Sequence, residues 1–230
     1  FYLGSGSSIE LNSFKNGPSS APYLVNTGAI TTGTIAGTLN FNGKGTGTNI
    51  PAAFPTGFNA FWLMKYECSQ QQYADFLNHL DLARANYLKT PFTSFTGTHP
   101  NLVPVAPDKA ITTVGYIATT SLADWSGLRP YTELEFEKAC RGYNTPAVPN
   151  EFAWGNTTYV AVNAIVDDKL PGEAVATPLD ANANIDGLGS ITRVGIFARS
   201  SGSDRTLSGG TYYGIMNMSD NVKEIVVYAG

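Results

Sequence analysis

Residues 129–142 read R-P-Y-T-E-L-E-F-E-K-A-C-R-G, and they carry the strongest local signals in the chain. Thr132 and Glu135 have the spacing of a capping box, in which each side chain accepts a hydrogen bond from the other residue's backbone N–H. The Phe, Ala and Cys that follow are spaced to share one helical face, and Gly142 is a residue type at which helices commonly end. We therefore predict a helix from Thr132 to Arg141 that packs on a core through this face.

A second capping box lies upstream, where Ser69 and Gln72 have the same spacing. The apolar residues from Tyr73 to Leu80 then recur at i, i+3, i+4 and i+7, which is typical of a helix with one buried face. The stretch Phe58–Glu67 that precedes this helix is rich in aromatic and aliphatic residues, and we predict a buried strand there.

The remaining chain indicates short strands, turns and irregular loops, because short apolar runs alternate with Gly, Pro, Ser and Asn. Further predicted elements are a strand ribbon within Thr31–Asn49, a loop at Thr90–Lys109, a strand at Ile111–Val114, a short helix at Ser121–Trp125, a turn at Trp154–Asn156, and strands at Thr192–Phe197 and Ile225–Tyr228. We divide the chain into a strand-rich segment, residues 1–57, which is part of the same domain or an assembly arm, and a main domain, residues 58–230. No further element follows the final predicted strand to pair with it. The alternative that the main domain is incomplete at its C-terminal end therefore stays open.

Composition narrows the classes of function. Only 14% of the 230 residues are charged and the net charge is −4, so the chain lacks the electropositive surface that nucleic-acid binding needs. The two histidines, His79 and His99, and the two cysteines, Cys68 and Cys140, do not have the spacing of a structural zinc site. No run of about 20 apolar residues suits a membrane span. We expect no nucleic-acid partner, no membrane span and no structural zinc.

Five landmarks occur in the order typical of one protein family. They are Glu67–Phe76, Arg129–Gly142, Ala153–Asn156, Asp186–Leu188 followed by Val194–Gly195, and Tyr213–Ile225. On these motifs the chain resembles the formylglycine-generating enzyme family, also called the sulfatase-modifying-factor domain. The resemblance covers roughly residues 58–227.

The resemblance implies an α+β fold, namely the formylglycine-generating-enzyme variant of the C-type lectin fold. That variant has short twisted antiparallel strands, two main helices and much irregular loop. The two capped helices and the many short strands predicted above agree with it.

Activity is a separate question from fold. In the family, the oxidase that makes formylglycine binds copper through two cysteines downstream of the last landmark, because thiolates suit copper(I). Only Val226–Gly230 follow that landmark, so we expect no copper site in this chain. Cys68 and Cys140 do not align with the catalytic pair, and we interpret them as buried thiols, with a disulfide as the alternative. The last landmark also departs from the family pattern at Asp220, Lys223 and Ile225.

The resemblance implies two calcium sites, and Ca²⁺ prefers about six to eight oxygen ligands of the kind that loops supply. The first site would use Asn163, the Ala164 carbonyl, Asp186 and the Leu188 carbonyl; the second would use Asn217, the carbonyls of Asp220 and Val222, and the carboxylate of Glu224. The alternative is that Asp186 belongs to a turn and Glu224 is a solvated strand residue.

The charged residues of the 129–142 segment could suggest acid–base chemistry, but we expect structural ion pairs. Glu133 and Glu137 are like charges four residues apart, which favours pairing with Arg129 and Arg141.

These observations leave two functions in competition. The first is a non-catalytic, calcium-stabilised domain of a secreted or cell-surface bacterial protein, used for binding or self-assembly into a filament or surface layer. Its partner would be itself or another surface protein, through strand addition at Ala29–Phe41, and a carbohydrate or peptide ligand is also consistent with it. The second is a copper-dependent formylglycine-generating oxidase whose catalytic C-terminal part is missing from this chain, so whether the protein is an enzyme stays open.

Overall fold

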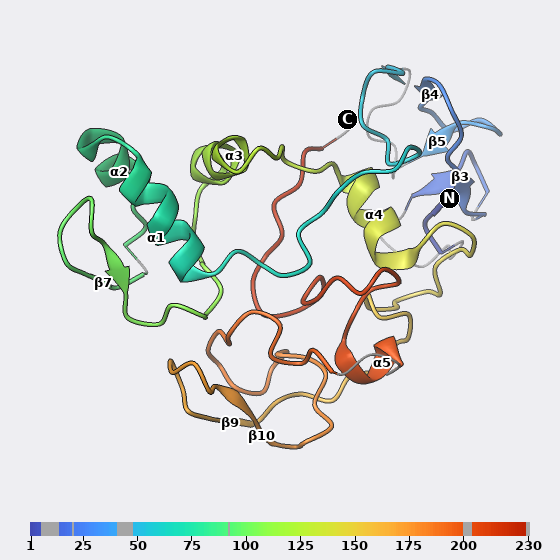
Figure 1. Cartoon of the computed structure of the whole chain (residues 1–230). Helices are drawn as coiled ribbons and strands as arrows, with labels where there is room; N and C mark the ends of the chain where they lie inside the picture. The colour runs from blue at the N-terminus through green and yellow to red at the C-terminus, as the bar shows by residue number, and fades with distance from the viewer. Residues whose placement is uncertain (6–13, 20, 41–47, 92, 200–203, 229–230) are drawn as a thin grey trace.

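Short helices and two- to four-residue strands build the protein, joined by long irregular segments (Figure 1). The computed structural model describes residues 1–5, 14–19, 21–40, 48–91, 93–199 and 204–228. This is a mixed α and β architecture with antiparallel strand pairs, as the α+β prediction requires.

The helix predicted first is confirmed as α4, Glu133–Arg141, with Thr132 as its N-cap and both hydrogen bonds of the capping box present. Gly142 ends it with a φ of 88°, and a Cβ on this residue would lie 2.6 Å from the ring of Tyr212. Only glycine satisfies both the left-handed backbone and the close ring.

The start of α4 also joins distant parts of the chain. The Thr132 hydroxyl donates to the carbonyl of Pro55 at 2.7 Å, and the N–H of Glu133 donates to the carbonyl of Val227 at 3.1 Å. The N–H of Val227 in turn donates to the carbonyl of Tyr131 at 2.9 Å.

The second capped helix is confirmed as α1, Gln70–His79, with the Ser69–Gln72 capping box formed. Of the four apolar residues whose spacing predicted the buried face, Tyr73, Phe76 and Leu77 are buried, whereas Leu80 is the half-buried C-cap. Gln70 and Ala74 are buried as well. A further helix, α2 at Leu82–Leu88, follows directly and was not predicted. Its N-cap Asp81 accepts from the N–H of Arg84.

The number and length of the helices differ from the prediction. The helix expected at Ser121–Trp125 is α3, Tyr116–Trp125, which begins five residues earlier after Gly115, so three helices have nine or ten residues rather than two. Ala118 and Leu122 lie four residues apart and both pack on the cluster around α1, which explains the additional turn. The four-residue α5, Arg205–Ser208, completes the helices of the described residues.

The N-terminal region contains six two-residue strands, as the prediction of short strands requires. They are β1 (Tyr2–Leu3), β2 (Lys15–Asn16), β3 (Tyr23–Leu24), β4 (Ile30–Thr31), β5 (Leu39–Asn40) and β6 (Asn49–Ile50). The pairs are β1 with β3, β2 with β5 and β4 with β6, all antiparallel. The ends of the predicted Thr31–Asn49 ribbon are therefore paired, while residues 41–47 lie outside the described part.

Two strand pairs were missed by the sequence analysis. One, β7 (Phe95–Thr96) with β8 (Val103–Pro104), lies in the predicted loop at Thr90–Lys109. The other joins β9 (Ala164–Val166) to β10 (Ala174–Thr177). Strands of two to four residues are too short to show the alternation on which a prediction depends.

Several predicted strands are wrong. Thr192–Phe197 instead folds into turns around Gly195, whose φ is 67°, and Ile111–Val114 includes Thr113 with a φ of 56°. Ile225–Tyr228 makes one isolated bridge, between Val227 and Thr132. Phe58–Glu67 is extended but forms no ladder in the described part of the chain. These segments contain apolar or β-branched residues, but beyond isolated bridges such as that of Arg193 with Lys109, no described strand pairs with them.

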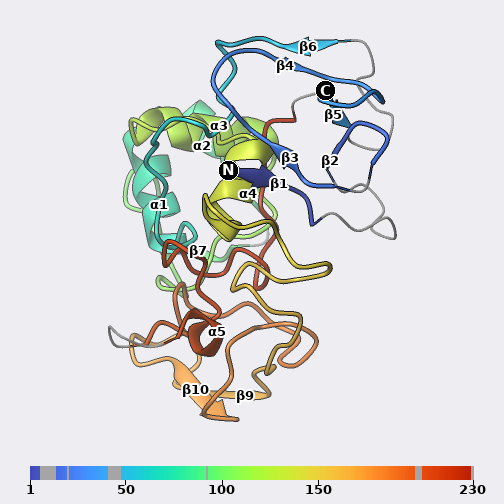
Figure 2. The same ribbon diagram turned by 90° about the vertical axis from the view of Figure 1, so that its right-hand side faces the viewer.

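The core consists of four apolar clusters arranged around α4 and the central loops. Figure 2 shows β1 to β6 grouped at one end of the molecule, with β9, β10 and α5 at the other. Leu134 of α4 is fully buried among apolar residues of the N-terminal strands, while Ala139 and Cys140 pack on a second cluster with Met218. Thus α4 connects the N-terminal strands with the loop that contains the predicted second calcium site.

Candidate calcium sites

The second predicted loop, residues 217–224, combines one buried and several partly buried polar side chains. Asn217, with 2% of its surface exposed and a φ of 62°, begins the loop. Its Nδ2 lies 3.2 Å from each carboxylate oxygen of Asp220, and its Oδ1 accepts from the N–H of Gly195 at 3.3 Å. The carboxylate of Asp220 also accepts from the N–H of Asn184 at 2.8 Å. Two predicted ligand residues, Asn217 and Asp220, are therefore in direct contact.

Asn221 holds this loop against two other segments. Its Oδ1 accepts from the N–H and hydroxyl of Thr192 at 2.9 and 3.2 Å and from Nδ2 of Asn184 at 3.1 Å. Its Nδ2 donates to Glu67 at 2.7 Å, and the other oxygen of Glu67 accepts from the N–H of Val222 at 3.2 Å. The carboxylate before α1 is thus part of the loop's hydrogen-bond network.

Glu224 completes a group of three partly buried carboxylates with Glu67 and Asp220. Its side chain accepts a hydrogen bond from the hydroxyl of Tyr131. Within the described residues, none of the three carboxylates forms a salt bridge with a lysine, arginine or histidine. The structure does not bring Glu224 into direct contact with Asn217 or Asp220.

The electrostatics of the group follow from burial. Burial, with repulsion from Asp220 and Glu224, raises the pKa of Glu67 to about 8, although the bonds from Asn221 and Val222 oppose the shift. Burial likewise raises the pKa of Asp220 to about 6 against two opposing hydrogen bonds. Burial also raises the pKa of Glu224, and repulsion from Asp220 raises this pKa further. Three carboxylates that resist ionisation together provide a favourable environment for a cation.

The geometry limits which atoms could bind that cation. Among the described residues, no three His, Cys, Asp or Glu side chains converge as metal ligands. A calcium ion at this loop would therefore depend on amide and backbone oxygens for most of its ligands. The predicted ligands supply such oxygens from the amide of Asn217 and the carbonyls of Asp220 and Val222. Glu224 adds one carboxylate, so the donor chemistry fits Ca²⁺.

The first predicted loop has a different character. Asn163 and Asp186 are exposed, and Asp186 has a φ of 56° and lies 3.4 Å from the Tyr159 hydroxyl. A Cβ on Gly187 would lie 2.1 Å from the carbonyl oxygen of Val162 and 3.2 Å from Oδ1 of Asn163. The two segments that contain the predicted ligands are therefore side by side, held by a close approach at glycine.

The other two predicted ligands of this loop are backbone carbonyls. Ala164 belongs to β9, and Leu188 packs on an apolar cluster that includes Val162. No described contact joins the Asn163 and Asp186 side chains directly.

The two cysteines are free thiols and form no disulfide. Cys68 precedes α1 and packs in its cluster, whereas Cys140 lies in α4 among different residues. Burial raises the pKa of Cys68 to about 12 and raises that of Cys140 as well. Neither thiol is disposed to be a thiolate ligand, and they lie in separate clusters.

The charged residues of α4 form ion pairs that fix loops. Arg129 binds Glu135 in a bidentate pair, with N–O distances of 2.6 and 2.8 Å. Arg141 binds both Glu137 and Glu151 at 3.2 Å, so its expected pairing with Glu137 is confirmed, while Arg129 pairs with Glu135 instead of Glu133 or Glu137.

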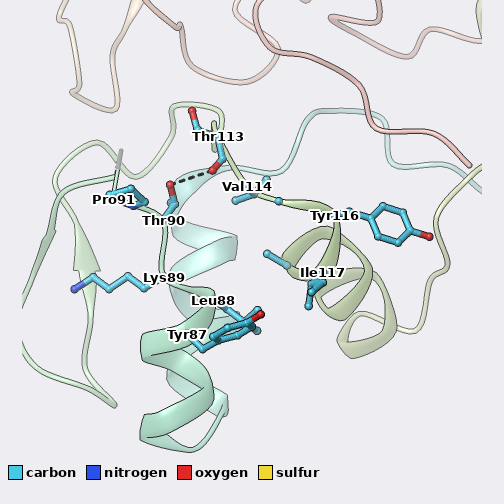
Figure 3. Close-up of a pocket in the computed structure, with 11 residues that line it drawn as sticks. Tyr87, Leu88, Lys89, Thr90, Pro91, Thr113, Val114, Tyr116 and Ile117 are labelled. Atoms are coloured by element: carbon cyan, nitrogen blue, oxygen red, sulfur yellow. Dashed lines mark hydrogen bonds between the residues drawn. The ribbon is translucent and has the colours of Figure 1, made fainter.

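An apolar groove of about 480 Å³ lies between the end of α2 and the start of α3. Figure 3 shows Leu88 and Ile117 on opposite sides of it, while the side chains of Lys89 and Tyr116 point away. The hydroxyl of Thr90 donates to the carbonyl of Thr113 at 3.3 Å. The groove provides apolar contact but no converging charged groups among the described residues that line it.

Sequence reasoning did not identify four polar residues of the second loop's network: Glu67, Tyr131, Asn184 and Asn221. Glu67 offered a signal, since an acidic residue ends an apolar stretch and begins the first landmark. Its distance of more than 150 positions from Asn221 concealed the contact.

The fold and the site define a mixed α and β domain with a partly buried group of carboxylates around an Asn- and Asp-containing loop. Comparison with protein families matches residues 14–227 to the sulfatase-modifying factor enzyme 1-like domain. The chain therefore belongs to this family, as its landmarks predicted. No curated protein and no solved structure matches it. No helix of the described residues is long and apolar enough to cross a membrane.

Proposed function

We propose that this chain is a calcium-stabilised, non-catalytic binding or assembly domain of a secreted or cell-surface bacterial protein. The observation that carries the proposal is a group of partly buried carboxylates around the 217–224 loop without a described cationic partner, namely Glu67, Asp220 and Glu224. Calcium at Asn217, the carbonyls of Asp220 and Val222, and Glu224 offsets their repulsion. The exposed loop with Asn163, Ala164, Asp186 and Leu188 is the second, weaker candidate site.

The proposed fold is the formylglycine-generating-enzyme variant of the C-type lectin fold. Its support is the family match together with the loop-rich structure. In this fold, loops rather than helices and strands present the ligand surface, which suits a binding module.

A calcium titration of thermal stability tests the calcium part of the proposal. A ligand that binds only the folded state at 100 times its Kd stabilises by about 2.7 kcal/mol, which raises the Tm of a protein of this size by roughly 5–11 °C. We expect this shift for the wild type and its loss in Glu224→Gln. Because the substitution also removes a buried charge, the Tm without calcium should stay unchanged or rise.

The control for that titration is Asp124→Asn, an exposed carboxylate on α3. It should retain the full calcium response. An unchanged wild-type Tm on calcium addition, or a response retained by Glu224→Gln, would exclude the second loop as a calcium site.

Self-assembly would use the Ala29–Phe41 segment. Its strand β4 pairs with β6 in a two-stranded sheet, which leaves its other edge outside that ladder, and Ile35 is 71% exposed. We expect oligomers by mass photometry, and a monomer throughout the micromolar range would contradict assembly.

Family membership supports a second candidate, a copper-dependent formylglycine-generating oxidase. Its chemistry needs a pair of thiolates, and Cys68 and Cys140 lie in separate clusters with raised pKa values, so the pair would have to come from other residues. Oxygen uptake with copper and a cysteine-containing peptide tests it directly. Uptake would reject the non-catalytic proposal.

A further inference from the structure

The extended segment that leads into α1 exposes an unusual row of apolar side chains. Trp62 is 94% exposed, and Phe58, Met64 and Tyr66 are also exposed. Phe61 and Leu63, by contrast, pack against the cluster around Ala139 and Cys140. From residue 61 to 64 the side chains therefore alternate between core and solvent, which is the pattern of a strand with one buried face.

The backbone of this segment lacks the partner that such a pattern requires. In the described structure, no hydrogen bond reaches the N–H or C=O groups of Ala60–Met64. At the C-terminal end of the segment, the carbonyl of Lys65 accepts from the N–H of Met216 at 2.9 Å. In Figure 1 the segment is the teal chain that passes from the side of α4 to the start of α1. Its backbone donors and acceptors therefore have no described hydrogen-bond partner and are available to a strand added from another chain.

Just before this segment, a lysine side chain fixes the backbone. The ammonium of Lys138 donates to the carbonyls of Gly57, Phe58 and Asn59 at 2.6, 3.4 and 3.2 Å. Because α4 holds this end, the following residues are presented as a preformed edge, which lowers the ordering cost of binding.

A polar pocket adjoins the same end of the segment. It has a volume of about 250 Å³ and is lined by residues of the 52–61 loop together with Arg129 and Glu135. Peptides added to a sheet edge gain affinity from backbone bonds and specificity from pockets of this kind.

One exposed cation, Lys65, adjoins the edge, although the whole chain has a net charge of −4. Lys65 is exposed and forms no ion pair with any described residue, and Lys138 faces carbonyls rather than a carboxylate. The nearest acidic residue in sequence, Glu67, is turned toward Asn221. The edge is therefore complementary to an acidic segment.

We propose that Ala60–Met64 is a docking edge for an extended, acidic segment of another polypeptide, which adds as a β-strand. Apolar side chains at alternate positions of that segment contact Trp62 and Met64, and an acidic side chain lies near Lys65. This names a partner class for the binding half of the proposed function and is independent of its calcium half.

Panning a displayed library of random linear peptides of about ten residues tests the proposal. We expect enrichment of peptides with alternating apolar residues and at least one Asp or Glu. Trp62→Glu should weaken the enriched peptide at least tenfold, whereas Tyr87→Glu, a matched exposed aromatic on α2, should leave binding unchanged. N-methylation of alternate peptide bonds should abolish binding, because it removes the N–H donors that a strand partner needs.

Charge reversal provides the sharpest control. Against Lys65→Glu, the same library should yield basic instead of acidic peptides. The proposal would be overturned if the wild type enriched peptides no better than Trp62→Glu does. It would also be overturned if Lys65→Glu selected peptides of the same charge as the wild type. A dimer in sedimentation that Trp62→Glu dissociates would also overturn it, because a second copy would then be the occupant. The panning is done in the presence of calcium. If calcium fails to raise the Tm in the separate thermal titration, that result would count against the calcium sites but not against the docking edge.

Discussion

The two loops proposed to bind calcium differ in what holds them together. Loop 217–224 is largely half-buried, and its partly buried carboxylates and a hydrogen-bonded asparagine connect it to three other segments. The loop at Asp186 lies at the surface, where Gly187 packs closely on the carbonyl of Val162. A calcium ion would therefore contribute unequally to stability at the two loops. Burial strengthens the repulsion between carboxylates, and this repulsion is what the ion would offset.

The largest expected effect is a pH dependence of the calcium-free protein that arises around loop 217–224. The pKa of Glu67 is about 8 in the folded state against an ordinary value of 4.5, so the folded state retains a proton that the unfolded state releases. Stability is therefore greatest below about pH 4.5 as far as this group is concerned, and it falls as the pH rises towards 8. We expect a loss on the order of a few kcal/mol, measured by urea unfolding across this range.

Two comparisons isolate that effect. Glu67→Gln should flatten the pH profile, because its side chain does not titrate. Saturating calcium should flatten it as well, since a bound cation favours the ionised carboxylates. A wild-type profile without calcium that is flat between pH 5 and 8 would show that the repulsion is absent.

Removal of the Asn221 side chain should have the next largest effect. Asn221→Ala eliminates four hydrogen bonds and places alanine at a φ of 64°, where asparagine is better tolerated. We expect a loss of about 3 kcal/mol in the free energy of unfolding, from unpaired buried groups and backbone strain. Asn144→Ala, at an exposed position, is the matched control and should change it little.

A glycine substitution tests the exposed loop. Gly187→Ala should cost about 1–3 kcal/mol, because its Cβ would overlap the Val162 carbonyl and force the segments apart. Gly115→Ala, where a Cβ meets nothing within 4 Å, is the control. Equal melting temperatures for the two variants would show that the close approach does not hold this loop.

The smallest effect is expected for Asp186→Asn. This side chain is exposed, so loss of its charge should change the calcium-dependent stabilisation by less than about 0.5 kcal/mol. A calcium response that disappears in this variant, measured by the same thermal titration, would reverse the ranking of the two loops.

How much the sequence could predict depended on the distance between interacting residues. The helices α1 and α4 were predicted with their caps, because capping boxes and apolar spacing are local signals. The strands predicted at Thr192–Phe197 and Phe58–Glu67 were wrong because a run of apolar residues does not specify a ladder partner.

The same limit applies to the candidate site. The proposed ligands Asn217, Asp220 and Glu224 came from the resemblance, since no spacing rule links them. The contact between Glu67 and Asn221 could not be read locally, because it joins residues 154 positions apart.

The junction at Thr132 has a consequence for synthesis of the protein. This residue joins the carbonyl of Pro55 to the neighbourhood of Val227, so the beginning and the end of the domain meet there. A ribosome must release the chain beyond residue 227 before that meeting is complete. Until then the nascent N-terminal strands lack the bridge between Thr132 and Val227, and holdase chaperones are the natural protection in the interval.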